Sequence, residues 1–374
     1  MIVTRLHLQN FRNHTESQIS WAPRLNIITG PNGAGKTNLI DAIHYLCMSR
    51  SFVAGTDQYV VTSGEKTFSV SGTFEGNIRS KAFDVRCTYG RGEGKKIFVN
   101  DSPLDKLSDL IGRVPVVVLS PDDKKLTSEG PAERRSFLDS FISQLSSAYL
   151  RDLIDFRRAL KQRNALLSDF RMSKQVMEAM IEPWNAQLVS VGSRIVLRRQ
   201  QTLQQFAEHL ERGYEQIAGI GHHPRFEYKT LTSNLDSEET IAQDYRNQLE
   251  EAFEKERERQ QTTIGPHRDD IVFYLDDKEL RKFGSQGQHR LFALALKLAQ
   301  KAYYAAEMED QPIFLLDDVF GDLDPQKTKV LITMLLAHEG QTFITAANVS
   351  LFSSFLEPEE GKDRFYSVLN AQIS

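Results

Sequence analysis

The sequence predicts an α/β fold in which a mostly helical lobe is inserted into a P-loop nucleotide-binding lobe. Three observations indicate this: a glycine-rich phosphate-loop pattern near the N-terminus, strand-like segments up to about residue 125, and helical spacing through the middle of the chain. From residue 264 onward, apolar strands again alternate with helices, as in a parallel sheet. We therefore expect residues 1–125 and 262–374 to form one lobe and residues 126–261 to form the inserted helical lobe.

The phosphate-loop pattern is complete and lies in a suitable context. Residues 30–37 read Gly-Pro-Asn-Gly-Ala-Gly-Lys-Thr and fit G-x-x-x-x-G-K-T, with a strand-like segment before them (25–28) and helical spacing after them (38–48). This arrangement directs backbone N–H groups at one point, where unpaired donors and the helix dipole favour an anion. A glycine-rich turn that matches by chance is the alternative, but the context favours a nucleoside triphosphate site.

The residue types in this loop match the chemistry of phosphate binding. The glycines let the backbone curl, Lys36 can reach the terminal phosphates, and the Thr37 hydroxyl can ligate Mg²⁺. The predicted nucleotide-binding residues of the loop are Gly30, Pro31, Asn32, Gly33, Ala34, Gly35, Lys36, Thr37 and Asn38.

Composition narrows the class of protein. A chain of 374 residues with 40% hydrophobic and 26% charged residues is typical of a soluble globular protein with two lobes. The N-terminus alternates like a strand and no run of eighteen apolar residues occurs, so we expect a cytosolic protein without a membrane partner. Cys47 and Cys87 lack the spacing of a zinc or disulfide framework. Because the net charge is −4, nucleic-acid binding would need a local basic patch.

The first third of the chain predicts an antiparallel β-layer. Residues 2–8 alternate between apolar and polar, and residues 68–74, 82–89 and 96–99 have the lengths of short strands, with a hairpin turn at residues 90–94. A further apolar segment, residues 114–119, looks like a buried strand of the main sheet.

The helical middle carries an unusual charge balance. Helical spacing extends from Pro131 to about residue 215, and we expect Pro183 to divide it. Residues 134–163 hold seven Lys or Arg against three Asp, a net charge of +4 in an acidic protein. This face is either an ordinary solvated surface or a DNA contact. The candidate DNA-binding residues are Arg157, Arg158, Lys161 and Arg163.

The last quarter supplies a Walker-B pattern. Residues 312–316 are apolar and precede Asp317 and Asp318. Asp317 would hold Mg²⁺ through water at the carboxyl end of the strand. The carboxylate of Asp318 would orient or deprotonate the attacking water, so Asp318 and Lys36 are the predicted catalytic residues.

A short motif precedes this strand. Ser285, Gly287 and Gln288 stand at the start of a long apolar helix, where a hydroxyl and free N–H groups can meet a γ-phosphate. The motif is weak alone, but its place before the Walker-B strand resembles the ABC-type ATPase head, in which this helix contacts ATP held by a second head. The resemblance implies an ATP-sandwiched homodimer.

Motifs outside the nucleotide site resemble the RecF family, whose members are SMC-like ATPase heads without a long coiled coil. The motifs are residues 6–13 (Leu-x-Leu-x-Asn-Phe-Arg-Asn), 50–52 (Arg-Ser-Phe), 119–123 (Leu-Ser-Pro-Asp-Asp), 134–139 (Arg-Arg-x-Phe-Leu-Asp), 160–164 (Leu-Lys-Gln-Arg-Asn) and 265–270 (Gly-Pro-His-Arg-Asp-Asp). The resemblance implies ATP and Mg²⁺ as cofactors, phosphate contact by Arg12, and a weak, DNA-stimulated ATPase activity. It also implies a role in recombinational repair, in which RecF with RecO and RecR helps to load RecA onto gapped DNA coated with single-strand-binding protein.

The sequence departs from general ABC heads at several positions. Asp318 stands where those enzymes have Glu, which suggests slow hydrolysis, and no Q-loop glutamine can be placed. Residues 321–324 match the D-loop, with Asp322 or Asp324 expected to reach across the dimer, and Thr345 lies near the usual switch histidine.

Two other functions share the head motifs. One is the ATP-hydrolysing subunit of a membrane transporter, and the other is an SMC-like structural protein that binds DNA without turnover. The motifs outside the ATP site favour the RecF-like function over both.

Overall fold

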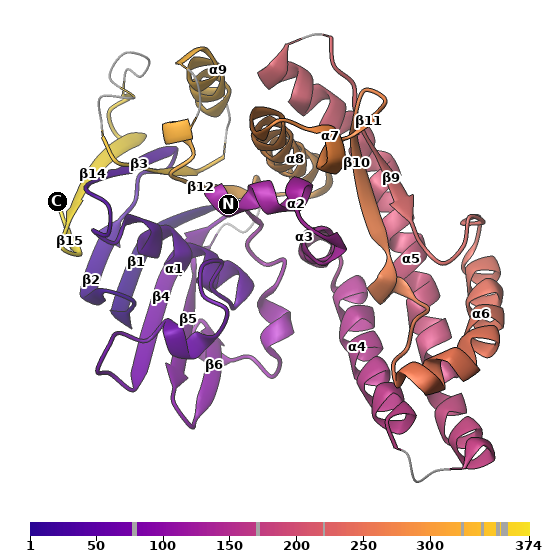
Figure 1. Ribbon diagram of the computed structural model, residues 1–374. Helices are drawn as coiled ribbons and strands as arrows, with labels where there is room; N and C mark the ends of the chain where they lie inside the picture. The colour runs from indigo at the N-terminus through magenta and orange to yellow at the C-terminus, as the bar shows by residue number, and fades with distance from the viewer. Residues whose placement is uncertain are drawn as a thin grey trace. The chain divides into compact units, whose positions relative to one another are not determined.

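The computed structural model describes residues 1–76, 81–169, 173–219, 221–322, 325–337, 340–348, 352 and 358–374. By its internal contacts the chain divides into two compact units. The head unit comprises Met1–Lys124, Arg212–Gly221 and Ala293–Ser374, and the helical unit comprises Lys125–Glu211 and His222–Phe292 (Figure 1).

The main sheet of the head unit joins distant parts of the chain. Its strand order is β15-β14-β3-β13-β12-β8, and β14, β3, β13, β12 and β8 are parallel. The bounds are β3 Leu25–Thr29, β8 Val116–Leu119, β12 Ile313–Asp317, β13 Thr342–Ala346, β14 Asp363–Leu369 and β15 Gln372–Ile373. Every residue of β3, β12 and β13 is buried, as expected for a parallel sheet covered on both faces. Strands from both ends of the chain therefore lie in one sheet.

A second, antiparallel sheet forms the β-layer of the head unit. Its order is β2-β1-β4-β5-β6-β7, with β1 Ile2–Phe11, β2 His14–Ser20, β4 Thr67–Glu75, β5 Phe83–Gly90, β6 Gly94–Val99 and β7 Ser102–Pro103. Buried and less buried residues alternate along β4, because one face of the sheet packs inward. Helix α1 (Lys36–Met48) contacts strands of both sheets, and all its residues except Thr37 and Asn38 are buried. The core of the head unit therefore surrounds α1 and leaves only its first turn accessible.

The helical unit is built on two long antiparallel helices. These are α4 (Ser147–Leu167) and α5 (Lys174–Ala218), linked by contacts of Arg163 with Asn185 and of Asp152 with Arg194. Besides α1, the structure describes the helices α2 Lys125–Ser128, α3 Pro131–Leu145, α6 Glu238–Arg259, α7 Leu280–Phe283, α8 Gln286–Glu307 and α9 Pro325–Leu336. Short 3₁₀ turns occupy Asp57–Tyr59, Leu107–Leu110, Pro121–Lys124, Pro266–Arg268 and Phe320–Asp322.

Two expectations about the helical middle need correction. Pro183 lies inside α5 and does not divide the helical region, because Ile181 and Leu188 on either side of it are buried and packing outweighs the one lost backbone bond. The unit also extends beyond residue 261. Strand β10 (Asp270–Leu275) pairs with β9 (Pro224–Lys229) in the order β11-β10-β9, so the residues up to Phe292 belong to this unit and not to the head. Strand β11 is Lys278–Glu279.

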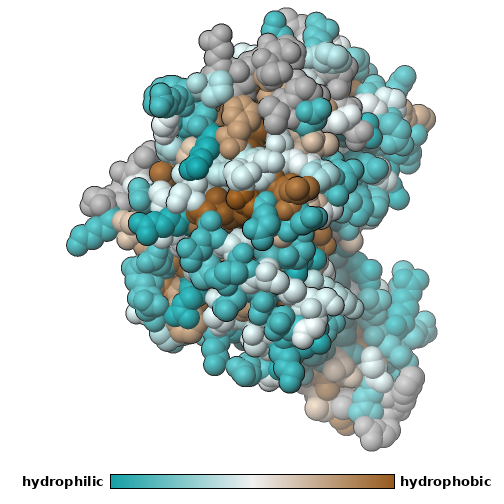
Figure 2. All heavy atoms as spheres, turned by 90° about the vertical axis from the view of Figure 1, so that its left-hand side faces the viewer, coloured by the Kyte–Doolittle hydropathy of each residue, from teal (hydrophilic) through white to brown (hydrophobic). Residues whose placement is uncertain are grey.

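The face of the head unit that Figure 2 shows is mainly polar. A band of hydrophobic residues crosses the middle of this face. Among the described residues, no helix combines the length and apolarity that crossing a lipid bilayer requires.

Candidate nucleotide-binding site

The phosphate loop connects β3 to α1, and its glycines are required by geometry. Gly30 and Gly35 have φ values of 150° and 108°, which side-chain-bearing residues rarely adopt. A Cβ atom on Gly30 would lie 2.1 Å from the carbonyl oxygen of Val368, and one on Gly35 would lie 2.8 Å from side-chain atoms of Asn13 and His14. The loop is therefore clamped between β14 and the turn after β1, and only glycine fits at both positions.

The side chain of Lys36 is hydrogen-bonded to the backbone of the phosphate loop. Its ammonium group donates to the carbonyl oxygens of Gly30 at 2.7 Å and Pro31 at 3.0 Å, and the side chain is buried. A triphosphate in the loop would offer this cation charged acceptors, which form stronger hydrogen bonds than neutral carbonyls.

The Walker-B carboxylate is held by two hydroxyl groups. The hydroxyls of Thr37 and Thr345 both donate to Oδ1 of Asp317, at 2.8 Å and 2.7 Å. The backbone N–H of Asp318 donates to the Thr345 hydroxyl at 3.0 Å. Burial raises the pKa of Asp317, and the two hydroxyl donors oppose that shift. Carboxylate and hydroxyl oxygens are the hard ligands that Mg²⁺ prefers, so the donor set fits this ion.

A pocket of about 220 Å³ brings together six of the nine predicted loop residues and Asp318, whereas Gly30, Pro31, Ala34 and Asp317 do not line it. Asp318 lines it in a left-handed conformation with φ 47°, a strained state for a residue other than glycine. The remaining lining residues are Asn32, Gly33, Gly35, Lys36, Thr37, Asn38 and Thr345. The two halves of the sequence pattern, which are 280 positions apart at Thr37 and Asp317, thus meet at one site.

Arg12 lies beside the site but does not line the pocket. Its guanidinium donates to Asp41 at 3.3 Å, to Ser51 at 3.1 Å and to the carbonyl oxygen of Tyr59 at 3.3 Å. The motifs at residues 6–13 and 50–52 therefore meet at the buried Asp41, and the phosphate contact of Arg12 stays a prediction.

Asn13 and His14 support the loop, a role that was not predicted for them. Asn38 donates to the side-chain oxygen of Asn13 at 2.7 Å, and His14 donates to the carbonyl oxygen of Gly35 at 3.2 Å. Their signal was the polar turn Phe11-Arg-Asn-His14, which directly follows the first strand.

The Ser-x-Gly-Gln motif lies in the helical unit and caps a helix. The Ser285 N–H donates to Oε1 of Gln288 at 2.8 Å, and the Gln288 N–H donates to the Ser285 hydroxyl at 3.2 Å. This reciprocal capping box begins α8. Ser285 and Gly287 are exposed and Gln288 is half-buried, so an anion can reach the N-terminus of the helix.

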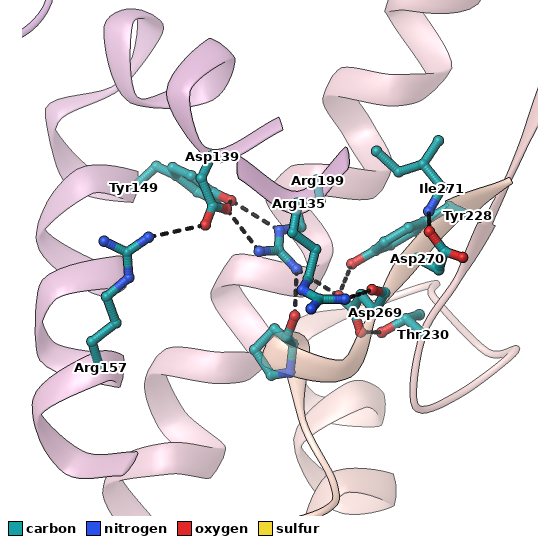
Figure 3. A network of polar contacts seen from close by, with 11 residues as sticks. Arg135, Asp139, Tyr149, Arg157, Arg199, Tyr228, Thr230, Asp269, Asp270 and Ile271 are labelled. Carbon is teal, nitrogen blue, oxygen red and sulfur yellow. Dashed lines mark hydrogen bonds and ion pairs between the residues drawn. The ribbon is translucent and has the colours of Figure 1, made fainter. Parts of the chain in front are cut away.

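The motifs at residues 134–139 and 265–270 meet in a buried polar network (Figure 3). The buried Arg199 donates to Asp139 and Asp269, both at 2.7 Å. Arg134 forms a two-pronged ion pair with Asp270, at 2.7 Å and 3.0 Å. Two family-like motifs that are far apart in sequence thus stabilise one site in the helical unit.

The candidate DNA-binding residues separate into two groups. The side chains of Arg157 and Arg158 are 67% and 71% exposed, and Lys161 is exposed as well. Arg163 is fully buried and pairs with Glu256 at 2.6 Å, so the prediction that it contacts DNA is corrected. Of the expected D-loop residues, Asp324 and the side chain of Asp322 lie outside the described residues.

These features define a class of protein. One strand separates the Asp317 strand from the phosphate-loop strand. The chain also has an antiparallel β-layer, a helical unit and a Ser-x-Gly-Gln motif that caps a helix. This combination is that of SMC-like ATPase heads. A model of the RecF/RecN/SMC N-terminal domain matches residues 2–367. The chain belongs to this family, and within it to the RecF proteins.

Individual relatives agree with this assignment. The DNA replication and repair protein RecF of Salinibacter ruber is 43% identical over 372 residues, which cover 98% of this chain and 90% of that protein. RecF of Chloroherpeton thalassium is 39% identical over 349 residues, which cover 92% of this chain and 94% of that protein.

Solved structures give the same result for the fold. A structure described as the recombination mediator protein RecF with ATP in the RecFOR pathway has a TM-score of 0.91 and 27% identity, and it covers 100% of this chain and 96% of its own. An SMC head bound to a domain of ScpA, with 14% identity and a TM-score of 0.55, shares the fold alone.

Proposed function

We propose that this protein is an ATP-dependent DNA-binding protein of recombinational repair, acting with RecO and RecR to help load RecA onto gapped DNA coated with single-strand-binding protein. ATP binding would close a homodimer and slow hydrolysis would open it. Family membership supports the pathway, and it disfavours the membrane-transporter alternative. The observation that carries the ATP-dependent step is the pocket in which the phosphate loop meets Asp318, with Asp317 hydrogen-bonded to Thr37 of the same loop.

The chain's own residues supply most of the chemistry in this proposal. Lys36 and the loop N–H groups would hold the β- and γ-phosphates, and Thr37 and Asp317 would hold Mg²⁺. When bound, Mg²⁺ neutralises charge on the phosphate oxygens. Asp318 orients the attacking water, and its shorter side chain places the carboxylate further from the γ-phosphate than Glu would, so hydrolysis is slow.

The proposed dimer brings Ser285, Gly287 and Gln288 of one copy to the ATP held by the other. These residues are accessible at the N-terminus of α8, where a phosphate is stabilised by N–H donors and the helix dipole. A γ-phosphate is required for this contact, so ATP should support the dimer and ADP should not.

Sedimentation of the purified protein tests the proposal, with ATP, ADP or no nucleotide, each with and without gapped DNA. We expect an ATP-specific dimer that retains gapped DNA. Lys36→Ala should remain monomeric with ATP, whereas the exposed Lys66→Ala serves as a charge-matched control and should dimerise. A Lys36→Ala protein that still dimerises with ATP would exclude the sandwich mechanism.

The exposed basic residues of α4 are the proposed DNA contacts. Phosphate contacts dominate sequence-independent DNA binding. Reversing the charges of Arg157, Arg158 and Lys161 should therefore lower the affinity for duplex DNA. It should also make the slope of log affinity against log salt concentration shallower, by up to about 0.9 per lost phosphate contact. Unchanged affinity and slope would show that this face is only solvated. The charge-matched control reverses three exposed residues of α6, which are Arg246, Lys255 and Arg259.

An SMC-like protein that binds DNA without turnover is the second candidate. The strained Asp318 in the pocket favours hydrolysis over this function. DNA-stimulated release of phosphate that disappears in Asp318→Asn would separate the two, and absence of turnover in the unaltered protein would support the second candidate.

A further inference from the structure

A second pocket, of about 250 Å³, lies in the helical unit beside the buried network. Side chains of Leu153, Phe156 and Ile195 form an apolar wall. Three guanidinium groups, from Arg135, Arg157 and Arg199, also line it. Figure 3 shows Arg157 on one side of the network and Arg135 close to Arg199 at its centre.

The three arginines differ in how their charges are compensated. Arg199 is neutralised by its ion pairs with Asp139 and Asp269, and Arg157 lies 3.3 Å from the Asp139 carboxylate. Arg135 donates only to the main-chain carbonyl oxygen of Asp269, at 2.7 Å. In the part of the chain that the structure describes, Arg135 makes no ion pair. Among the residues that the structure describes, Arg135 is therefore the guanidinium of this pocket that forms no direct ion pair with a carboxylate.

Arg135 is also half-buried. Burial, with the neighbouring charge of Arg199, lowers the pKa of Arg135 from its ordinary value, while the nearby carboxylates of Asp269, Asp270 and Asp139 oppose that shift. The group nevertheless keeps its charge, because the unperturbed pKa of arginine is so high. Asp139 is the one carboxylate that lines the pocket, and it already serves Arg199 and Arg157. An anion in the pocket would give Arg135 the direct ion pair that these more distant carboxylates do not form with it.

We propose that this pocket binds a phosphate group, with Arg135 as its principal ligand and Arg157 as a second ligand at the solvent side. The planar fork of arginine matches two oxygens of a phosphate. The source that the surroundings favour is the backbone of a DNA strand, because Arg157 also belongs to the exposed basic face of α4 and the apolar wall can pack against a sugar. That source rests on the DNA binding proposed above, whereas the phosphate site itself does not.

A titration with inorganic phosphate tests the site directly. The side-chain Nε–H signals of ¹⁵N-labelled arginines are followed in the full chain, with a non-hydrolysable ATP analogue present to fill the phosphate loop. We expect the Arg135 signal to shift, and phosphate affinity to fall about tenfold or more in Arg135→Gln, since a charge-assisted contact is lost. If Arg135→Gln does not fold, Arg157→Gln replaces it, because that side chain is 67% exposed. Arg246→Gln, outside the pocket, is the matched control.

A second arm measures duplex DNA affinity against salt concentration. Loss of about 0.9 in slope for Arg135→Gln, with no change for Arg246→Gln, would identify DNA as the source of the phosphate. A lost phosphate titration with an unchanged DNA slope would assign the site to free phosphate. An unshifted Arg135 signal together with an unchanged slope would overturn the proposal. If the unaltered protein binds no DNA, the function proposed above is refuted. The phosphate titration would still show whether the pocket binds phosphate.

Discussion

The ion pair between Arg163 and Glu256 gives a prediction that separates burial from surface charge. Both side chains are 0% exposed, and Nη1 of Arg163 lies 2.6 Å from Oε2 of Glu256. Arg163 also donates to Asn185 at 2.6 Å and to the Thr262 hydroxyl at 2.8 Å. The pair therefore connects α4, α5 and α6 inside the helical unit.

Replacing Arg163 with Met keeps the apolar stem and leaves the Glu256 carboxylate buried without a counter-ion. Removing one partner of a buried pair costs about 3–5 kcal/mol, because the remaining charge is uncompensated. Adding Glu256→Gln removes that charge and keeps Oε1 as an acceptor for the N–H groups of Thr263 and Ile264. The double variant should therefore lose only about 1–2 kcal/mol, mainly from hydrogen bonds of the guanidinium.

Urea unfolding followed by Trp184 fluorescence reports on the helical unit, because Trp184 lies in α5 next to Asn185. The other tryptophan, Trp21, is changed to Phe in every variant to remove the signal of the head unit. A loss below about 1 kcal/mol for Arg163→Met would contradict the burial of the pair. A double variant no more stable than the single one would show that packing, and not charge, causes the loss. Folded Arg163→Met should also bind DNA with an unchanged salt slope.

Three further predictions concern the head unit. Thr345→Val removes a donor to Asp317 and should lower the free energy of unfolding by about 1–3 kcal/mol, measured by urea unfolding with Trp21 as the probe. Burial lowers the pKa of Lys301 to about 7, so the charged side chain destabilises the folded protein fully below pH 7 and progressively less up to the unfolded pKa of about 10.5. Lys301→Met should therefore stabilise the protein at about pH 6, and this gain should be lost by about pH 10. An equal gain at both pH values would contradict the lowered pKa. Gly35→Ala should abolish binding of a fluorescent ATP analogue, because its Cβ would lie 2.8 Å from Asn13, while thermal unfolding should confirm that the protein still folds.

The nucleotide site could be predicted from the sequence because its signals are local. The phosphate loop and the Asp317 strand each combine an apolar strand with residues at fixed spacing, and parallel pairing brings the carboxyl ends of β3, β13 and β12 together. Strand β14 was not predicted, since charged and polar residues interrupt its apolar ones. Its pairing with β3 is also set by contacts far apart in sequence.

The error at Arg163 came from reading charge without the helical period. The buried residues of α4 include Tyr149, Leu153, Phe156, Arg163 and Leu167. Arg163 is two turns after Phe156, so it lies on the apolar face of the helix. The sequence contained this information, but its buried partner Glu256 is 93 positions away in the chain and could not be found by local spacing.

The capping box of α8 has a consequence for how nucleotide binding can be detected. The side chains of Ser285 and Gln288 each accept a hydrogen bond from the other residue's backbone N–H. A phosphate that binds the Ser285 hydroxyl must therefore replace this cap, whose loss costs about 0.5–2 kcal/mol. The phosphate can itself accept from the freed N–H groups, so the helix start exchanges an internal cap for an external one. Amide hydrogen exchange in the first turn of α8 would then slow when the second copy delivers ATP, and this short segment would record the closed state without a label.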